Sequence, residues 1–95
     1  MDQLPEGLSA YRRTATFTET TIPAGLLKDH ETAAGVWAVI HVESGQLRYV
    51  VPSGGDDFVL DSETLGFVVP ETLHHVAPLG PVSFFVEFWR DAGTT

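Results

Sequence analysis

The side chains best suited to chemistry in this chain are its four histidines, because the sequence contains no cysteine. Two of them, His74 and His75, are adjacent and follow a turn at Pro70. Consecutive residues of an extended segment point to opposite faces, so only one of this pair can easily enter a buried site. His30 and His41 lie far away in the sequence. Any site with more than one imidazole must therefore be assembled by the fold.

Neutral imidazole binds zinc, iron, nickel and copper ions well, and two histidines with one carboxylate on a β scaffold form a recurrent divalent-metal site. The spacing gives little support by itself, since the chain has no His-x-His or His-x-x-x-His pair. A lone histidine in a short β domain is more often a surface or hydrogen-bonded residue than a ligand. We expect His41 and His75 to be of that kind, and the sequence leaves open whether either joins a site.

Glu87 is the most informative carboxylate, because it lies in the most hydrophobic segment of the chain, between Val86 and Phe88. An unpaired charge there would be costly, so the carboxylate needs a cation or a hydrogen-bond donor. One interpretation is a metal ligand, or a carboxylate that orients a ligating histidine. The alternative is an ion pair with an arginine (Arg12, Arg13 or Arg48) or a hydrogen bond to a tyrosine. The sequence does not decide between them.

Nucleophilic catalysis finds little support. The chain has no Gly-x-Ser-x-Gly motif and no phosphate-binding glycine loop ahead of a helix. Ser53-Gly54-Gly55 is interpreted as a turn. The aromatic residues are most simply core or interface residues, with a pocket lining as the minority interpretation.

These residues are carried by apolar, β-branched runs separated by glycine and proline, which indicates about seven or eight short strands in an all-β sandwich or barrel. No segment shows a helical apolar stripe. Ser44-Gly45 predicts a hairpin turn between two apolar runs. Residues 1–10 are expected to be an extended lead-in, residues 11–90 the single domain, and residues 91–95 a C-terminal tail. The expected strands cover residues 11–18, 36–43, 46–51, 58–61, 66–69, 73–77 and 82–89.

Composition limits the classes of partner. The chain has 95 residues and a formal net charge of −8, which disfavours binding to nucleic acid and to anionic membranes. No apolar run is long enough for a membrane helix, and the acidic N-terminus has no features of a secretion signal, so we expect a cytoplasmic protein. The segment 82–89 is apolar on both faces. Because a second cover is needed, we expect a homodimer.

Several segments together resemble the TehB/YeaR-like domain family, a cupin-type β-barrel found as small bacterial proteins and fused to a methyltransferase linked with tellurite resistance. The resemblance covers nearly all of residues 11–90. It departs from the family pattern at Leu73, where an aromatic residue is expected, and at Val39, where a basic one is. The matching segments are Tyr11-Arg12-Arg13-Thr14, residues 21–27, Asp29-His30-Glu31-Thr32, Gly35-Val36-Trp37, residues 45–49, Pro70-Glu71-Thr72-Leu73-His74 and residues 86–90.

The resemblance implies a single-domain cupin-like β-barrel or jelly-roll sandwich. It also implies a divalent metal ion, zinc, nickel or iron, at His30 and His74 with Glu87 nearby. The expected function is binding or sensing of a small molecule or oxyanion in tellurite, metalloid or nitrosative stress. A cupin-type oxygenase or isomerase using the same site, and a metal-free accessory module, are the alternatives.

Overall fold

The regular structure of the chain is predominantly β-sheet, as the sequence predicts. The structure is a computed structural model that describes residues 4–91. Within this range the helical elements are two short 3₁₀ turns. The elements are β1 (Leu8–Arg13), β2 (Phe17–Thr18), η1 (Ala24–Leu27), β3 (Trp37–Val51), η2 (Pro52–Gly54), β4 (Asp56–Leu60), β5 (Gly66–Val68) and β6 (His75–Asp91).

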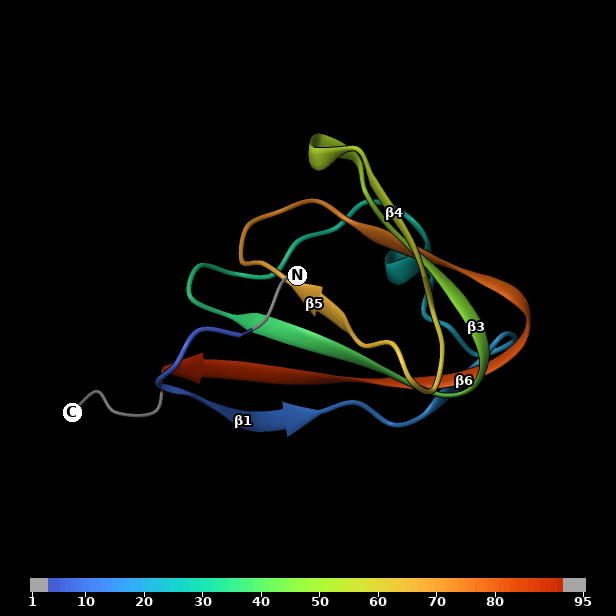
Figure 1. Ribbon diagram of the computed structural model, residues 1–95, viewed down its shortest axis with the longest axis horizontal. Coiled ribbons are helices and arrows are strands. Elements are labelled where there is room, and N and C mark those ends of the chain that lie inside the picture. Colours follow the sequence, from blue (N-terminus) through green and yellow to red (C-terminus); the bar gives the residue numbers. More distant parts are fainter. Residues whose placement is uncertain (1–3, 92–95) are drawn as a thin grey trace.

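All of these strands belong to one antiparallel sheet built around the two longest. The main path of the sheet runs β1-β6-β3-β4, while β2 pairs with β6 and β5 pairs with β3. β3 has 15 residues and β6 has 17, and they pair with each other along most of their length. Figure 1 shows both strands curving through the molecule.

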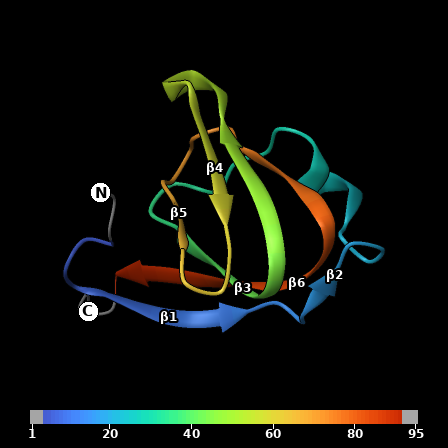
Figure 2. The ribbon, with the colours of Figure 1, turned by 45° about the vertical axis from the view of Figure 1, so that its right-hand side comes forward.

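The two long strands divide the sheet into two layers. The first part of β3 pairs with β5 and with the end of β6, while the second part of β3 pairs with β4 and with the start of β6. β1 extends the layer at the end of β6. Figures 1 and 2 show the layer of β4 standing over the layer of β1 and β5, joined by the bends of β3 and β6. Side chains from both layers therefore face a common interior.

The predicted hairpin at Ser44-Gly45 is wrong, because both residues lie inside β3. The pairing of β3 with β6 shifts register on either side of Gly45, so the glycine marks bulges and not a turn. Gly45 has a φ of +78°, and a Cβ atom there would collide with the carbonyl oxygen of Pro81. Residues 78–81, expected to separate two strands, likewise lie within β6.

The core follows the alternation of β3 and β6. Phe84 is fully buried, and its ring meets that of Phe17 edge to face with centroids 5.7 Å apart. Tyr49 is also buried, and its hydroxyl donates to the carbonyl of Phe67 at 2.9 Å. The buried cluster consists of Ala38, Ile40, Val42, Leu47, Tyr49, Leu60, Val68, Val76, Val82 and Phe84.

The ends of the chain differ in part from the expected boundaries. β1 begins at Leu8, so residues 8–10 of the expected lead-in are paired with β6. β6 ends at Asp91, while residues 1–3 and the rest of the expected tail, residues 92–95, lie outside the described residues. No helix in residues 4–91 is long and apolar enough to cross a membrane.

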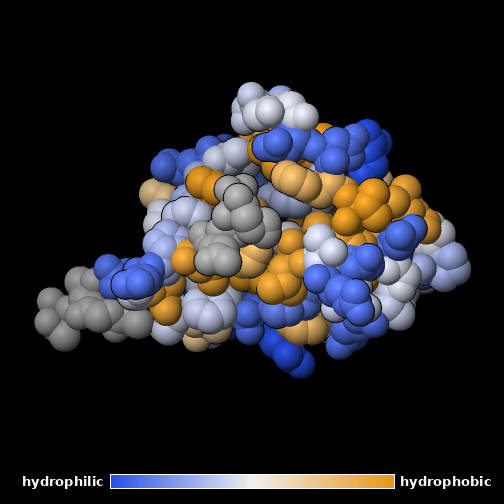
Figure 3. All heavy atoms as spheres, in the orientation of Figure 1, coloured by the Kyte–Doolittle hydropathy of each residue, from blue (hydrophilic) through white to orange (hydrophobic). Residues whose placement is uncertain are grey.

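Large apolar side chains also remain at the surface. Figure 3 shows hydrophobic residues on one face of the molecule, mainly at its centre and right. The exposed large apolar residues are Tyr11, Leu27, Phe58, Val59, Leu65, Val69, Leu73 and Leu79.

Candidate functional site

The fold brings His30 and His74 together. His30 follows η1, and His74 directly precedes β6. Each backbone N–H donates to the carbonyl of the other residue at 2.9 Å, which makes an isolated antiparallel bridge. The ring centroids are 4.2 Å apart, with the ring planes at 59° to each other. The two imidazoles therefore form a contiguous pair.

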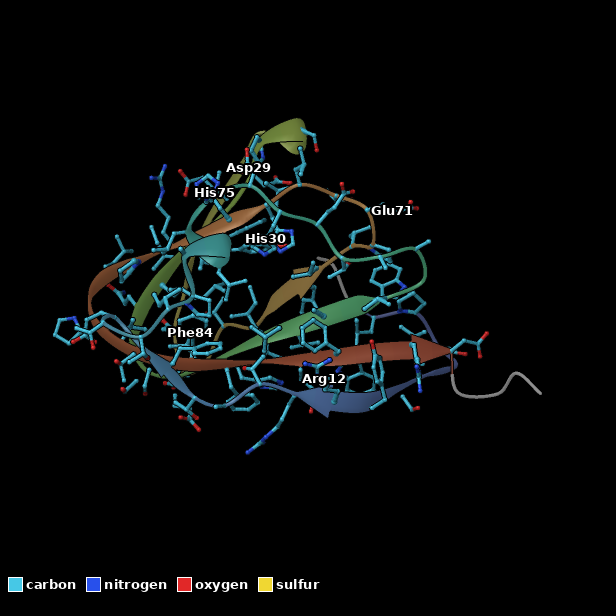
Figure 4. All side chains as sticks on the ribbon, turned by 180° about the vertical axis from the view of Figure 1, so that it is seen from behind. Arg12, Asp29, His30, Glu71, His75 and Phe84 are labelled. Atoms are coloured by element: carbon cyan, nitrogen blue, oxygen red, sulfur yellow. The ribbon has the colours of Figure 1, made fainter. Side chains whose placement is uncertain are left out.

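The residues next to the two histidines, Asp29 and His75, add a side-chain hydrogen bond to this bridge. Asp29 precedes one histidine and His75 follows the other, and His75 Nδ1 lies 2.7 Å from Asp29 Oδ1. His75 does not line the interior pocket that His74 lines. The prediction that only one of the two adjacent histidines enters a buried site is confirmed. Figure 4 shows Asp29 and His75 beside each other, near His30.

Hydrogen bonds to the backbone fix the tautomer of both rings. His30 Nδ1 lies 2.9 Å from the carbonyl oxygen of Lys28, and His74 Nδ1 lies 2.9 Å from that of Thr72. A carbonyl oxygen can only accept, so each Nδ1 carries the hydrogen. In the neutral ring, Nε2 is then left with a lone pair. This arrangement, in which the other ring nitrogen is held by a carbonyl, is typical of histidines that bind metals.

The Nε2 atom of His74 is open to the pocket. His74 is only 4% exposed, yet no buried side-chain nitrogen or oxygen in residues 4–91 lacks a hydrogen-bond partner. No described residue hydrogen-bonds this Nε2, so the atom must reach open space. Burial lowers the pKa of His74, and the nearby His30 acts in the same direction, while the bond to Thr72 opposes them. His74 is therefore neutral near pH 7, as a metal ligand must be.

The pair opens into a pocket of about 480 Å³ between the two layers. This volume is within the range of small-molecule sites, roughly 300–1,000 Å³. Figure 4 shows His30 beside η1, and Phe84 lower down on β6. Most of the wall is apolar, and the apolar residues include Phe17, Leu26, Val36, Ala38, Ile40, Val68, Val76, Phe84, Val86 and Phe88.

The two threonine hydroxyls on the wall are already engaged. The hydroxyl of Thr14 donates to the carbonyl of Ala15 and accepts from the N–H of Val86. The hydroxyl of Thr32 donates to the carbonyl of Val36 at 2.7 Å. Arg12 and Glu31 are exposed residues that also line the pocket, so they lie at its rim.

Glu87 is not brought to the two histidines, contrary to the expected three-residue ligand set. It belongs to the opposite face of β6 from Phe84, Val86 and Phe88, which line the pocket. Its Oε1 atom lies 3.1 Å from His41 Nε2 and accepts from Trp89 Nε1 at 2.9 Å. The need for a donor in this apolar strand is therefore met by a histidine and a tryptophan, and not by an arginine or a tyrosine.

The histidines outside the pair are hydrogen-bonded, as expected. His41 bonds to Glu87 and stacks on Phe85 with centroids 4.7 Å apart, while His75 bonds to Asp29. Within residues 4–91, no group of three or more histidine, aspartate or glutamate side chains is placed to hold a metal ion. The described chain would thus offer a metal ion two ligands, His30 and His74.

Sequence reasoning did not identify Arg12 as a pocket residue. β1 pairs Ala10 with Trp89 and Arg12 with Phe88, so Tyr11 is an extra residue in a bulge. The bulge puts Arg12 on the same face as Phe88, which lines the pocket. The adjacent Arg13 faces the other way and lies over the Phe85 ring, 4.5 Å from its centroid. The two arginines are alike in sequence, and only the bulge separates their roles.

Fold and site together define a small antiparallel β protein with a two-histidine pocket between its layers. The sequence profile described as the TehB-like domain matches residues 12–86, most of the chain. The chain therefore belongs to the TehB-like domain family. No curated protein sequence matches it.

Solved structures share the fold. One is the crystal structure of TehB from Haemophilus influenzae, with 23% identity and a TM-score of 0.81 over 90% of this chain. The match spans 32% of that protein, so the chain corresponds to about a third of TehB. Another is a structural-genomics protein from Escherichia coli strain K12, with 20% identity and a TM-score of 0.89, covering 97% of this chain and 99% of the other. At these identities the likeness concerns the fold.

Proposed function

We propose that this domain binds a divalent transition-metal ion, zinc, nickel or iron, at His30 and His74 and uses the pocket to bind or sense a small molecule. The observation that carries the proposal is the common tautomer of the pair. Both rings donate from Nδ1 to a backbone carbonyl, which leaves an Nε2 lone pair on each of two contacting rings that line an apolar pocket. Histidines bind these metals through such lone pairs.

The spacing of the rings suits this role after a small adjustment. Two imidazoles on one tetrahedral ion, with metal–nitrogen distances of about 2.0–2.1 Å, have ring centroids about 5 Å apart. The centroids of His30 and His74 are 4.2 Å apart. Each ring would have to move by about half an ångström, which side-chain rotation in an open pocket allows. With two protein ligands, the ion would keep open positions for a ligand and would act there as a Lewis acid.

Two protein ligands favour binding over catalysis, since catalytic zinc sites usually have three. We therefore rank the cupin-type oxygenase or isomerase below the binding role. We propose the cupin-type jelly roll as the description of this two-layer sheet. The association with tellurite, metalloid or nitrosative stress is proposed from family membership, as is a cytoplasmic location.

Metal titration of protein purified without a histidine tag tests the proposal. Titration calorimetry with ZnCl₂ and NiCl₂ should show about one equivalent bound by the wild type. The double variant His30→Ala/His74→Ala should bind neither metal. His41→Ala is the matched control, because His41 is bonded to Glu87 on the other face. Equal binding by the wild type and the double variant would refute the site at His30 and His74, and no binding by either would leave the metal-free module as the better description.

A homodimer remains part of the proposal. The outer face of β3 and β6 carries the half-buried aromatic residues Trp37, Phe85 and Trp89, which would be covered by the same face of a second copy. Analytical ultracentrifugation at micromolar concentration should give twice the monomer mass of 10.3 kDa. The monomer mass would remove the dimer from the proposal.

A further inference from the structure

We propose that the pocket takes an organic anion with an apolar body and one carboxylate, which Arg12 binds, and not an inorganic oxyanion alone. This inference rests on the proposed function in one respect, that the pocket is a ligand site. It does not require that the metal ion is bound.

The wall of the pocket selects for an apolar body. A pocket of about 480 Å³ is far larger than a four-atom or five-atom oxyanion, and its wall is made largely of apolar side chains such as Ile40, Val86 and Phe88. An oxyanion needs several donors, but the hydroxyls of Thr14 and Thr32 already donate to backbone carbonyls. An anion without an apolar part would lose hydration there and gain few hydrogen bonds.

The histidine pair cannot supply the missing donors in its neutral form. The Nδ1 hydrogens of His30 and His74 are bonded to Lys28 and Thr72, so each Nε2 is an acceptor. Metal-free, this end of the pocket repels negative oxygen atoms and accepts hydrogen bonds. The anionic group of a ligand must therefore be bound elsewhere.

Arg12 is the group placed to bind it. Among the four arginines, Arg48 is paired with Asp57, Arg13 lies over Phe85 and Arg90 lies over Tyr11. The guanidinium of Arg12 pairs with no acidic side chain and no ring of residues 4–91, although the chain carries a net charge of −8. Its fork of donors fits a carboxylate bidentately. The bulge in β1 holds it at the rim, above the apolar wall.

NMR titration of the metal-free protein tests this inference with three probes. Hexanoate has both an apolar body and a carboxylate, 1-hexanol has the body alone, and tellurite has the charge alone. Hexanoate should shift the amide signals of pocket residues such as Ile40, Val86 and Phe88. Tellurite should leave these signals in place. Arg12→Gln should raise the Kd for hexanoate about tenfold, as expected for one charge-assisted contact, and should leave 1-hexanol binding unchanged.

Arg13→Gln is the matched control, because Arg13 is adjacent in sequence but faces away from the pocket. It should change the Kd for hexanoate less than twofold. Equal effects of the two arginine substitutions, absence of hexanoate binding, or tellurite shifts at the pocket amides would each overturn the inference. Metal titration tests the proposed metal site separately. A protein that binds zinc but not hexanoate would therefore refute only the inference about the organic anion.

Discussion

Gly45→Ala should destabilise the fold strongly, because two separate costs meet at this position. The φ of +78° is unfavourable for alanine by about 1–2 kcal/mol. The new Cβ would in addition collide with the backbone oxygen of Pro81, inside the pairing of β3 with β6. Overpacking of this kind costs about 1–3 kcal/mol when the surroundings can shift. We expect a total loss of about 2–5 kcal/mol in the free energy of unfolding.

Gly80→Ala separates these two costs. Gly80 has a φ of +89°, but a Cβ atom there would meet nothing within 4 Å. This variant should lose only the conformational part, about 1–2 kcal/mol. Urea unfolding followed by the fluorescence of Trp37 and Trp89 gives both values. If the two variants are destabilised equally, Gly45 does not pack against Pro81 as described, and the bulge does not join the two layers in this way.

Three further outcomes test the site and the core. The lowered pKa of His74 means that, as the pH falls below 6.5, the unfolded chain binds a proton before the folded one, so the free energy of unfolding should fall below this pH and should do so less in His74→Gln. Glu87→Gln should leave zinc affinity unchanged within about twofold, while shifting the emission of Trp89, whose Nε1 donates to Glu87; a large loss of zinc affinity would return Glu87 to the ligand set. Phe84→Ala should cost about 3–5 kcal/mol in urea unfolding, because the side chain is fully buried between the layers, and a loss under 1 kcal/mol would contradict that packing.

The strands could be predicted from the sequence because apolar and β-branched residues recur between glycine and proline. Their connections could not. A glycine with positive φ serves a turn or a bulge equally well, so Ser44-Gly45 does not reveal by itself that the chain continues as one strand. Whether the glycine forms a turn or a bulge depends on the segment that packs against it. For Gly45 this segment includes Pro81, more than thirty residues away in the sequence.

The candidate site could be predicted in part for a similar reason. The scarcity of histidine singled out His30 and His74, and the fold places them together. The side of Glu87 could not be assigned, because β6 is apolar on both faces and alternation then gives no contrast between inside and outside. The position of Arg12 at the pocket could not be predicted, because a bulge at the preceding residue reverses the face of the strand that simple alternation would give it.

The local geometry of the pair carries a final consequence for how the site works. Each ring is held by the carbonyl two residues before it, Lys28 for His30 and Thr72 for His74, so its orientation depends on the bridge and not on what fills the pocket. Such preorganisation reduces the cost of ordering the two rings when a ligand or ion arrives, and leaves the shift of about half an ångström per ring that a tetrahedral ion would require. A purely structural core would gain more from two apolar side chains at these positions, since an imidazole whose Nε2 faces the pocket makes no hydrogen bond to the fold through that atom. We therefore propose that the two imidazoles serve binding and not stability.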